Sequence, residues 1–159
     1  MTPLVEAAGR LAQSPLAEGL RAHAWLYPVV ETMHILGFVM LVGAVAVFDL
    51  RVLGLGRTLP LRALARHTLP WSVGSLVLVV PTGLLLFTVQ APDYIANPVF
   101  LLKLGLVGAA GLNALAFHLG PYRTAADAGP APPRARLQAG LSIGLWVAVI
   151  CCGRMLAYI

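Results

Sequence analysis

The fold is decided by the stretch from Pro28 to Leu50, which reads PVVETMHILGFVMLVGAVAVFDL. It is longer than the roughly 20 apolar residues that a helix needs to cross the hydrocarbon core of a bilayer. Glu31 and His34 stand three positions apart near its start, so on a helix they share one face. An ionisable pair inside a membrane span is energetically costly and by default marks a functional site. The stretch therefore predicts a transmembrane helix with a polar site in it.

The composition extends this interpretation to the whole chain of 159 residues. Hydrophobic residues make up 59% of it and charged residues only 11%, against about 25% in an average soluble domain. The formal net charge is +5, but the basic residues are scattered around the apolar segments and do not gather on one polar face. This pattern is typical of membrane topology and argues against nucleic acid as a partner. The sequence predicts an integral membrane protein in contact with the lipid bilayer.

Four apolar segments of suitable length predict an all-α, antiparallel four-helix membrane bundle over residues 25–159. The spans are expected at about 28–50, 67–90, 98–119 and 137–159. Residues 1–24 form a separate segment, in which apolar residues recur at helical spacing between positions 3 and 22. This spacing predicts one or two amphipathic helices on the membrane surface. Thr2-Pro3 and Ser14-Pro15 are both typical of helix starts.

Basic residues are distributed unequally among the predicted loops. The loops 51–66 and 120–136 hold seven arginines between them, whereas the loop 91–97 holds no Lys or Arg. Basic loops stay in the cytoplasm, so the first and third loops are expected there. Both termini are then expected on the outer side of the membrane.

A layer of polar residues is expected near the outer ends of the spans. At about 1.5 Å per residue, four ionisable side chains reach a similar depth from that side: Glu31, His34, Lys103 and Arg154. One interpretation is an ion-pair network that satisfies its own charges. The other is a pocket that binds a headgroup, a quinone ring or a transported solute. In either case we expect direct or water-bridged contacts between at least two of these residues.

A second polar layer is expected at the cytoplasmic ends of the spans. His67 begins the second predicted span and His118 ends the third, with Arg51 and Arg66 at a similar depth. Two histidines on facing helices could bind the iron of a b-type haem, and the arginines could pair with its propionates. The alternative is two interfacial histidines with ordinary hydrogen bonds. His34 lies about 20 Å away in depth from His118, so these two could not share one haem across straight helices.

Soft ligands offer a copper alternative. Cys151 and Met155 are four residues apart on one helix face, at about the depth of His34. Thiolate, thioether and imidazole groups suit Cu(I). The alternative is that both side chains only fill space, and no residue is assigned as a metal ligand.

Small residues predict where the last span packs. Gly140, Gly144, Ala148 and Cys152 recur every four residues and form a stripe along one face of the helix. Such stripes let membrane helices approach closely, so this face is expected at a helix contact.

Three segments resemble an uncharacterised family of short bacterial four-helix membrane proteins: ETMHILGFVMLVGAVAVFDLRVLG, NPVFLLKLGLVGAAGLNALAFH and GRMLAY. The polar positions that match are Glu31, His34, Asp49, Arg51, Asn97, Lys103, Asn113, His118, Arg154 and Tyr158. The resemblance implies a multi-pass protein of the bacterial inner membrane, and the distribution of arginines then predicts periplasmic termini. More remotely, the first helix is similar to copper-resistance D-type proteins and to four-helix haem-binding protoporphyrinogen oxidases. In those families a first-helix histidine is implicated in haem or metal handling, and His34 matches it.

These observations lead to one main functional expectation and two alternatives. The main expectation is an integral membrane redox protein that binds haem b or interacts with a quinone, and its expected partner is a quinone or a redox protein. The first alternative is a transporter or binding protein for a small solute or a metal ion such as copper. The second is a membrane module without chemistry of its own.

Overall fold

The computed structural model describes residues 3–122 and 131–158, and every regular element in this part of the chain is a helix. In chain order the helices are α1 (Pro3–Ala12), α2 (Pro15–Ala22), α3 (Leu26–Leu53), α4 (Leu61–Val89), α5 (Ala91–Ala96), α6 (Pro98–Leu119) and α8 (Pro133–Met155). The all-α class predicted from the sequence is confirmed.

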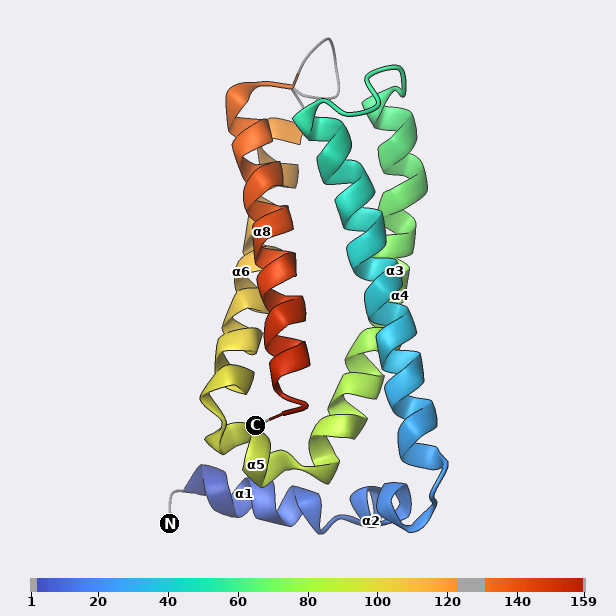
Figure 1. Cartoon of the computed structure of the whole chain (residues 1–159), viewed down its shortest axis with the longest axis vertical. Coiled ribbons are helices and arrows are strands. Elements are labelled where there is room, and N and C mark those ends of the chain that lie inside the picture. Colours follow the sequence, from blue (N-terminus) through green and yellow to red (C-terminus); the bar gives the residue numbers. More distant parts are fainter. Residues whose placement is uncertain (1–2, 123–130, 159) are drawn as a thin grey trace.

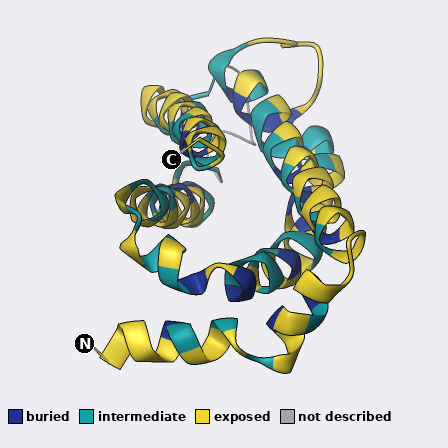
Figure 2. Cartoon of the chain, turned by 60° about the horizontal axis from the view of Figure 1, so that its bottom comes forward, coloured by how far each residue is buried: buried dark blue, intermediate teal, exposed yellow. Residues whose placement is uncertain are grey.

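Four helices are long and apolar enough to cross a membrane: α3, α4, α6 and α8. They run antiparallel to their neighbours in the sequence, and both chain ends lie at the same end of the bundle (Figure 1). Large apolar side chains on these helices, such as those of Val39, Val77 and Leu112, are exposed. Figure 2 shows that much of the length of the long helices is exposed. Exposed apolar surface on this scale suits contact with lipid chains. The predicted multi-pass membrane bundle is therefore the architecture of the chain.

Some of the helices extend beyond the predicted spans by a turn or more. The third span was expected at 98–119 and coincides with α6, but α4 begins at Leu61 and not at 67, and α8 begins at Pro133 and not at 137. The expected loop 91–97 contains the short helix α5. Helices extend past the hydrocarbon layer because their backbone hydrogen bonds are satisfied internally in both surroundings.

The long helices pack as two hairpins joined along one seam. The pairs α3–α4 and α6–α8 each pack along much of their length, and α3 packs against α8. Among the described helices, α4 and α6 make no extended contact with each other. At the end of the bundle where α3 turns into α4, the core contains Phe48 of α3 and Phe117 of α6. Their ring centroids lie 5.7 Å apart in an edge-on arrangement.

The amphipathic segment forms two helices that lie across the other end of the bundle (Figure 1). Ser14 caps α2, because its hydroxyl oxygen accepts a hydrogen bond from the backbone N–H of Ala17 (3.4 Å). The Arg21 guanidinium donates to the Val89 carbonyl at the end of α4 (2.9 Å) and to the Ala12 carbonyl at the end of α1. This arginine therefore joins both surface helices to the membrane-crossing part. The cap expected at Thr2 lies outside the described residues.

Candidate polar site around His34

His34 lies where α3 crosses α4. The crossing is close, since a Cβ on Gly37 of α3 would come within 2.9 Å of the Val79 side chain of α4. Across it, the His34 Nδ1 atom lies 3.0 Å from the Val79 carbonyl oxygen and 3.1 Å from the Thr82 hydroxyl. The Thr82 hydroxyl also contacts the Leu78 and Val79 carbonyls. An imidazole in this position donates its Nδ1–H to a backbone carbonyl, which leaves Nε2 as the acceptor atom.

Gly83 makes room for the imidazole ring. A Cβ on Gly83 would stand 2.9 Å from the His34 Cε1 atom, closer than such atoms approach in proteins. Pro81 lies two residues earlier within α4 and has no N–H to donate to the helix backbone. Three consecutive residues of α4 thus shape the surroundings of the imidazole. Pro81 lacks a backbone donor, Thr82 places its hydroxyl beside the ring, and Gly83 leaves space for it. No described residue forms a hydrogen bond with the His34 Nε2 atom.

Lys103 faces the same region from α6. It is half-buried, and its ammonium lies within electrostatic range of His34. The Lys103 Nζ atom is 3.6 Å from the place of a Cβ on Gly153, and the nearby Cys152 thiol exerts an electrostatic effect on it. No described residue forms a hydrogen bond or an ion pair with this ammonium. The Lys103 ammonium therefore lies near His34 of α3 and Cys152 of α8 without an anion among the described residues.

The outer layer expected from the sequence is assembled in part. Glu31 exerts an electrostatic effect on His34, but its side chain is exposed. Arg154 is the neighbour of Gly153 and is also exposed; its guanidinium donates to the Tyr158 hydroxyl and lies over the Tyr158 ring, 4.7 Å from the centroid. No hydrogen bond or ion pair joins any two of Glu31, His34, Lys103 and Arg154. The expected bridging contacts among them stay a prediction.

The residues of the second polar layer, at the cytoplasmic ends of the spans, do not form one common site for a haem between His67 and His118. His67 on α4 is exposed, and His118 on α6 directs its Nδ1 atom to the Ala114 carbonyl (2.8 Å) and packs against Tyr122. These two helices make no extended contact. The Arg51 guanidinium donates to the Leu59 carbonyl (2.7 Å) in the α3–α4 turn, and Arg66 is exposed. The two histidines thus lie on helices that make no extended contact with each other.

No known protein family, curated protein or solved structure matches the chain. Function is therefore argued from the chemistry of its own residues.

The soft ligands expected for copper, Cys151 and Met155, both have exposed side chains on α8, whereas the neighbouring Cys152 is buried. Within the described part of the chain, no three His, Cys, Asp or Glu residues gather closely enough to hold a metal ion.

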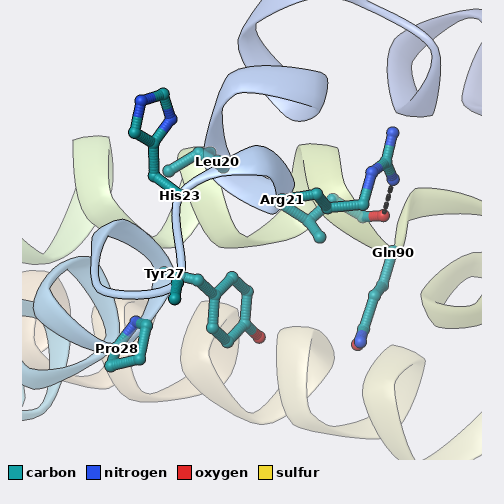
Figure 3. Close-up of a pocket in the computed structure, with 8 residues that line it drawn as sticks. Leu20, Arg21, His23, Tyr27, Pro28 and Gln90 are labelled. Atoms are coloured by element: carbon teal, nitrogen blue, oxygen red, sulfur yellow. Dashed lines mark hydrogen bonds between the residues drawn. The ribbon is translucent and has the colours of Figure 1, made fainter.

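A separate open pocket of about 420 Å³ lies where the surface helices join the bundle. Figure 3 shows Arg21, Tyr27 and Gln90 around it, with the Arg21 hydrogen bond to the Val89 carbonyl. The Tyr27 hydroxyl interacts with that of Tyr94 from α5. The Arg21 guanidinium and the Tyr27 hydroxyl thus have partners within the protein, and the other polar side chains at this pocket are those of His23 and Gln90.

Sequence reasoning identified His34 but missed its partners. Val79 contributes only a backbone carbonyl, which has no signature in a sequence. Thr82 and Gly83 directly follow a proline inside an apolar span, and this break was the signal that could have drawn attention to them.

Proposed function

We propose that the protein is a membrane haem protein of the b type in which His34 supplies the iron ligand. The observation that carries the proposal is the orientation of the imidazole: Nδ1 is engaged with the Val79 carbonyl, and Nε2 has no hydrogen-bond partner among the described residues. Metal-binding histidines commonly donate their second ring N–H to a carbonyl or carboxylate, which fixes the tautomer and raises the basicity of the ligating nitrogen. His34 meets that condition before any ligand arrives.

The charges around His34 complement those of a haem. A haem presents one iron and two carboxylates, and the same end of the bundle offers one imidazole and the two cations Lys103 and Arg154. Lys103 has no anion among the described residues, so a propionate would relieve the cost of holding this ammonium away from water. When bound, the haem would supply one-electron chemistry. The chain's own part is to orient the imidazole and to neutralise the carboxylates.

This ligand assignment differs from the pair His67 and His118 expected from the sequence. Those residues share a depth, but their helices make no extended contact, and His67 is exposed. The proposal agrees instead with the remote resemblance, which implies a role for a first-helix histidine.

The test is an absorption spectrum of the detergent-purified protein, produced with ample haem supply. We expect a Soret band that shifts on dithionite reduction. His34→Ala should remove the band, and the matched variant His118→Ala, which deletes a histidine of the other layer, should retain it. A colourless wild type, or loss of haem in His118→Ala alone, would contradict the proposal.

A second function is favoured by the free ammonium of Lys103. This ammonium would donate to an oxygen of a quinone ring or of a small acidic solute that binds beside His34. A colourless protein that binds a quinone analogue, with binding lost in both Lys103→Met and His34→Ala, would support this function in place of the first.

A further inference from the structure

Asp49 is a buried carboxylate at the opposite end of α3 from the His34 site. Its side chain is 7% exposed. The fifteen residues that separate it from His34 correspond to about 22 Å along a helix, so the two sites are independent. The Asp49 Oδ2 atom is fully buried and has no hydrogen-bond partner among the described residues. A buried charge without such partners is strongly unfavourable unless something neutralises it.

One residue of α8 contacts this carboxylate, and a second lies one turn away from it on the same face of the helix. The Ser142 hydroxyl interacts with Asp49. Gln138 lies one turn before Ser142 on the same face of α8, and its Oε1 atom is also buried without a partner. The Gln138 backbone carbonyl accepts a hydrogen bond from the Asn113 amide of α6 (3.0 Å), which links α6 to this part of α8. Two buried acceptor oxygens on the facing helices α3 and α8 thus lack a donor among the described residues.

The cations near Asp49 in the sequence do not supply that donor. Arg51 is engaged with the Leu59 and Arg57 carbonyls, and Arg57 with the Gly54 carbonyl. The cationic residues at this end of the facing helices have exposed side chains: Arg62, Arg66 and His67 on α4 and Arg134 and Arg136 on α8. Within the described chain, no ion pair involves Asp49.

We propose that Asp49, Ser142 and Gln138 form a buried binding site for a small monovalent cation, either a sodium ion or a proton. All the groups on offer are hard oxygen acceptors, which suit such cations and not a soft metal. A sodium ion would bind the carboxylate, hydroxyl and amide oxygens together. A proton would convert Asp49 into a donor for a neighbouring acceptor. Either cation removes the buried charge and binds between α3 and α8, the seam that joins the two hairpins.

The test measures thermal unfolding in detergent while Na⁺ is exchanged for choline at constant ionic strength, at several values between pH 5 and pH 8. A sodium site predicts a Tm that rises with Na⁺ concentration, by about 5 °C at a hundredfold excess over the dissociation constant. A proton site predicts a Tm that rises as the pH falls, with no difference between Na⁺ and choline. Asp49→Asn should abolish either response, whereas the matched variant Asp93→Asn, which changes an exposed carboxylate in α5, should preserve it.

A second variant covers the case in which Asp49→Asn does not fold. Gln138→Met keeps the carboxylate and removes one acceptor oxygen, so it should weaken the sodium response about tenfold in concentration or, for a proton site, reduce the response to pH. A wild-type Tm that responds to neither cation would overturn the proposal, as would a response that persists in Asp49→Asn or is unchanged in Gln138→Met.

Discussion

Single atoms determine the environment of His34. The hydrogen atom in place of a side chain at Gly83 leaves the space that the imidazole fills, and the Val79 carbonyl fixes the direction in which the ring presents its second nitrogen. Both features belong to α4, although the histidine belongs to α3. The site is therefore sensitive to changes on a helix that carries none of the ionisable groups of the outer layer.

Gly83→Ala tests this dependence. The added Cβ would stand 2.9 Å from the His34 ring, so the ring must move and its contact with the Val79 carbonyl weakens. Overpacking of this kind costs about 1–3 kcal/mol, and we expect a lower midpoint of SDS-induced unfolding in mixed micelles together with reduced haem binding.

The control is Gly140→Ala, where a Cβ would meet nothing within 4 Å. Alanine is a better helix former than glycine, so this variant should be neutral or more stable by up to about 1 kcal/mol. Equal effects of the two substitutions would mean that the space at Gly83 is not needed.

At the scale of elements, the surface helices depend on Arg21 for their attachment. Its guanidinium joins the end of α1 to the end of α4 through two carbonyls. Arg21→Gln removes at least one of these bonds, and a partly exposed bond to a charged donor contributes about 1 kcal/mol. Backbone amides of residues 3–22 should then exchange with deuterium about fivefold faster, while those of α3 should not change.

Arg10→Gln is the matched control, because Arg10 is an exposed arginine of α1 that bonds to none of the described residues. It should leave the exchange of residues 3–22 as in the wild type. The same acceleration in both variants would show that loss of charge, and not of the carbonyl contacts, releases the helices.

The elements themselves could largely be predicted from the sequence, whereas their contact faces could not. A long apolar run predicts a membrane helix because the bilayer requires one, and α6 coincides with its predicted span. The stripe of Gly140, Gly144, Ala148 and Cys152 was expected at a contact, but a Cβ added to either glycine would meet nothing within 4 Å. The buried residues of α8 are Ala135, Ala139, Ser142, Val149 and Cys152, and of these only Cys152 belongs to the predicted stripe. A span that is apolar all round gives little indication of which side meets protein and which meets lipid.

In the candidate site, too, the ionisable residues could be predicted from the sequence, whereas their contacts could not. His34 was predicted because an ionisable residue within a span is conspicuous, and Lys103 for the same reason. The Val79 carbonyl and the space at Gly83 depend on where α3 crosses α4. That position results from packing between helices and cannot be derived from the periodicity of either one.

At the scale of the whole molecule, orientation in the membrane is the outstanding prediction. The arginines of the loops 51–66 and 120–136 are expected in the cytoplasm. In a chain with Cys151→Ser and Cys152→Ala, an impermeant thiol reagent added to intact cells should label Ala96→Cys. It should label Thr58→Cys only after the cells have been permeabilised, so that the reagent reaches the cytoplasmic side of the membrane. The opposite pattern would invert the topology.

The seam between α3 and α8 has a consequence for biogenesis. Apart from that seam, most helix contacts join neighbours in the sequence, namely α3 with α4 and α6 with α8. Each hairpin can therefore form as soon as its own two spans have left the ribosome, without waiting for the rest of the chain. The late step is the docking of two finished hairpins within the lipid, and it is the step at which the carboxylate of Asp49 first leaves water for the interior of the protein.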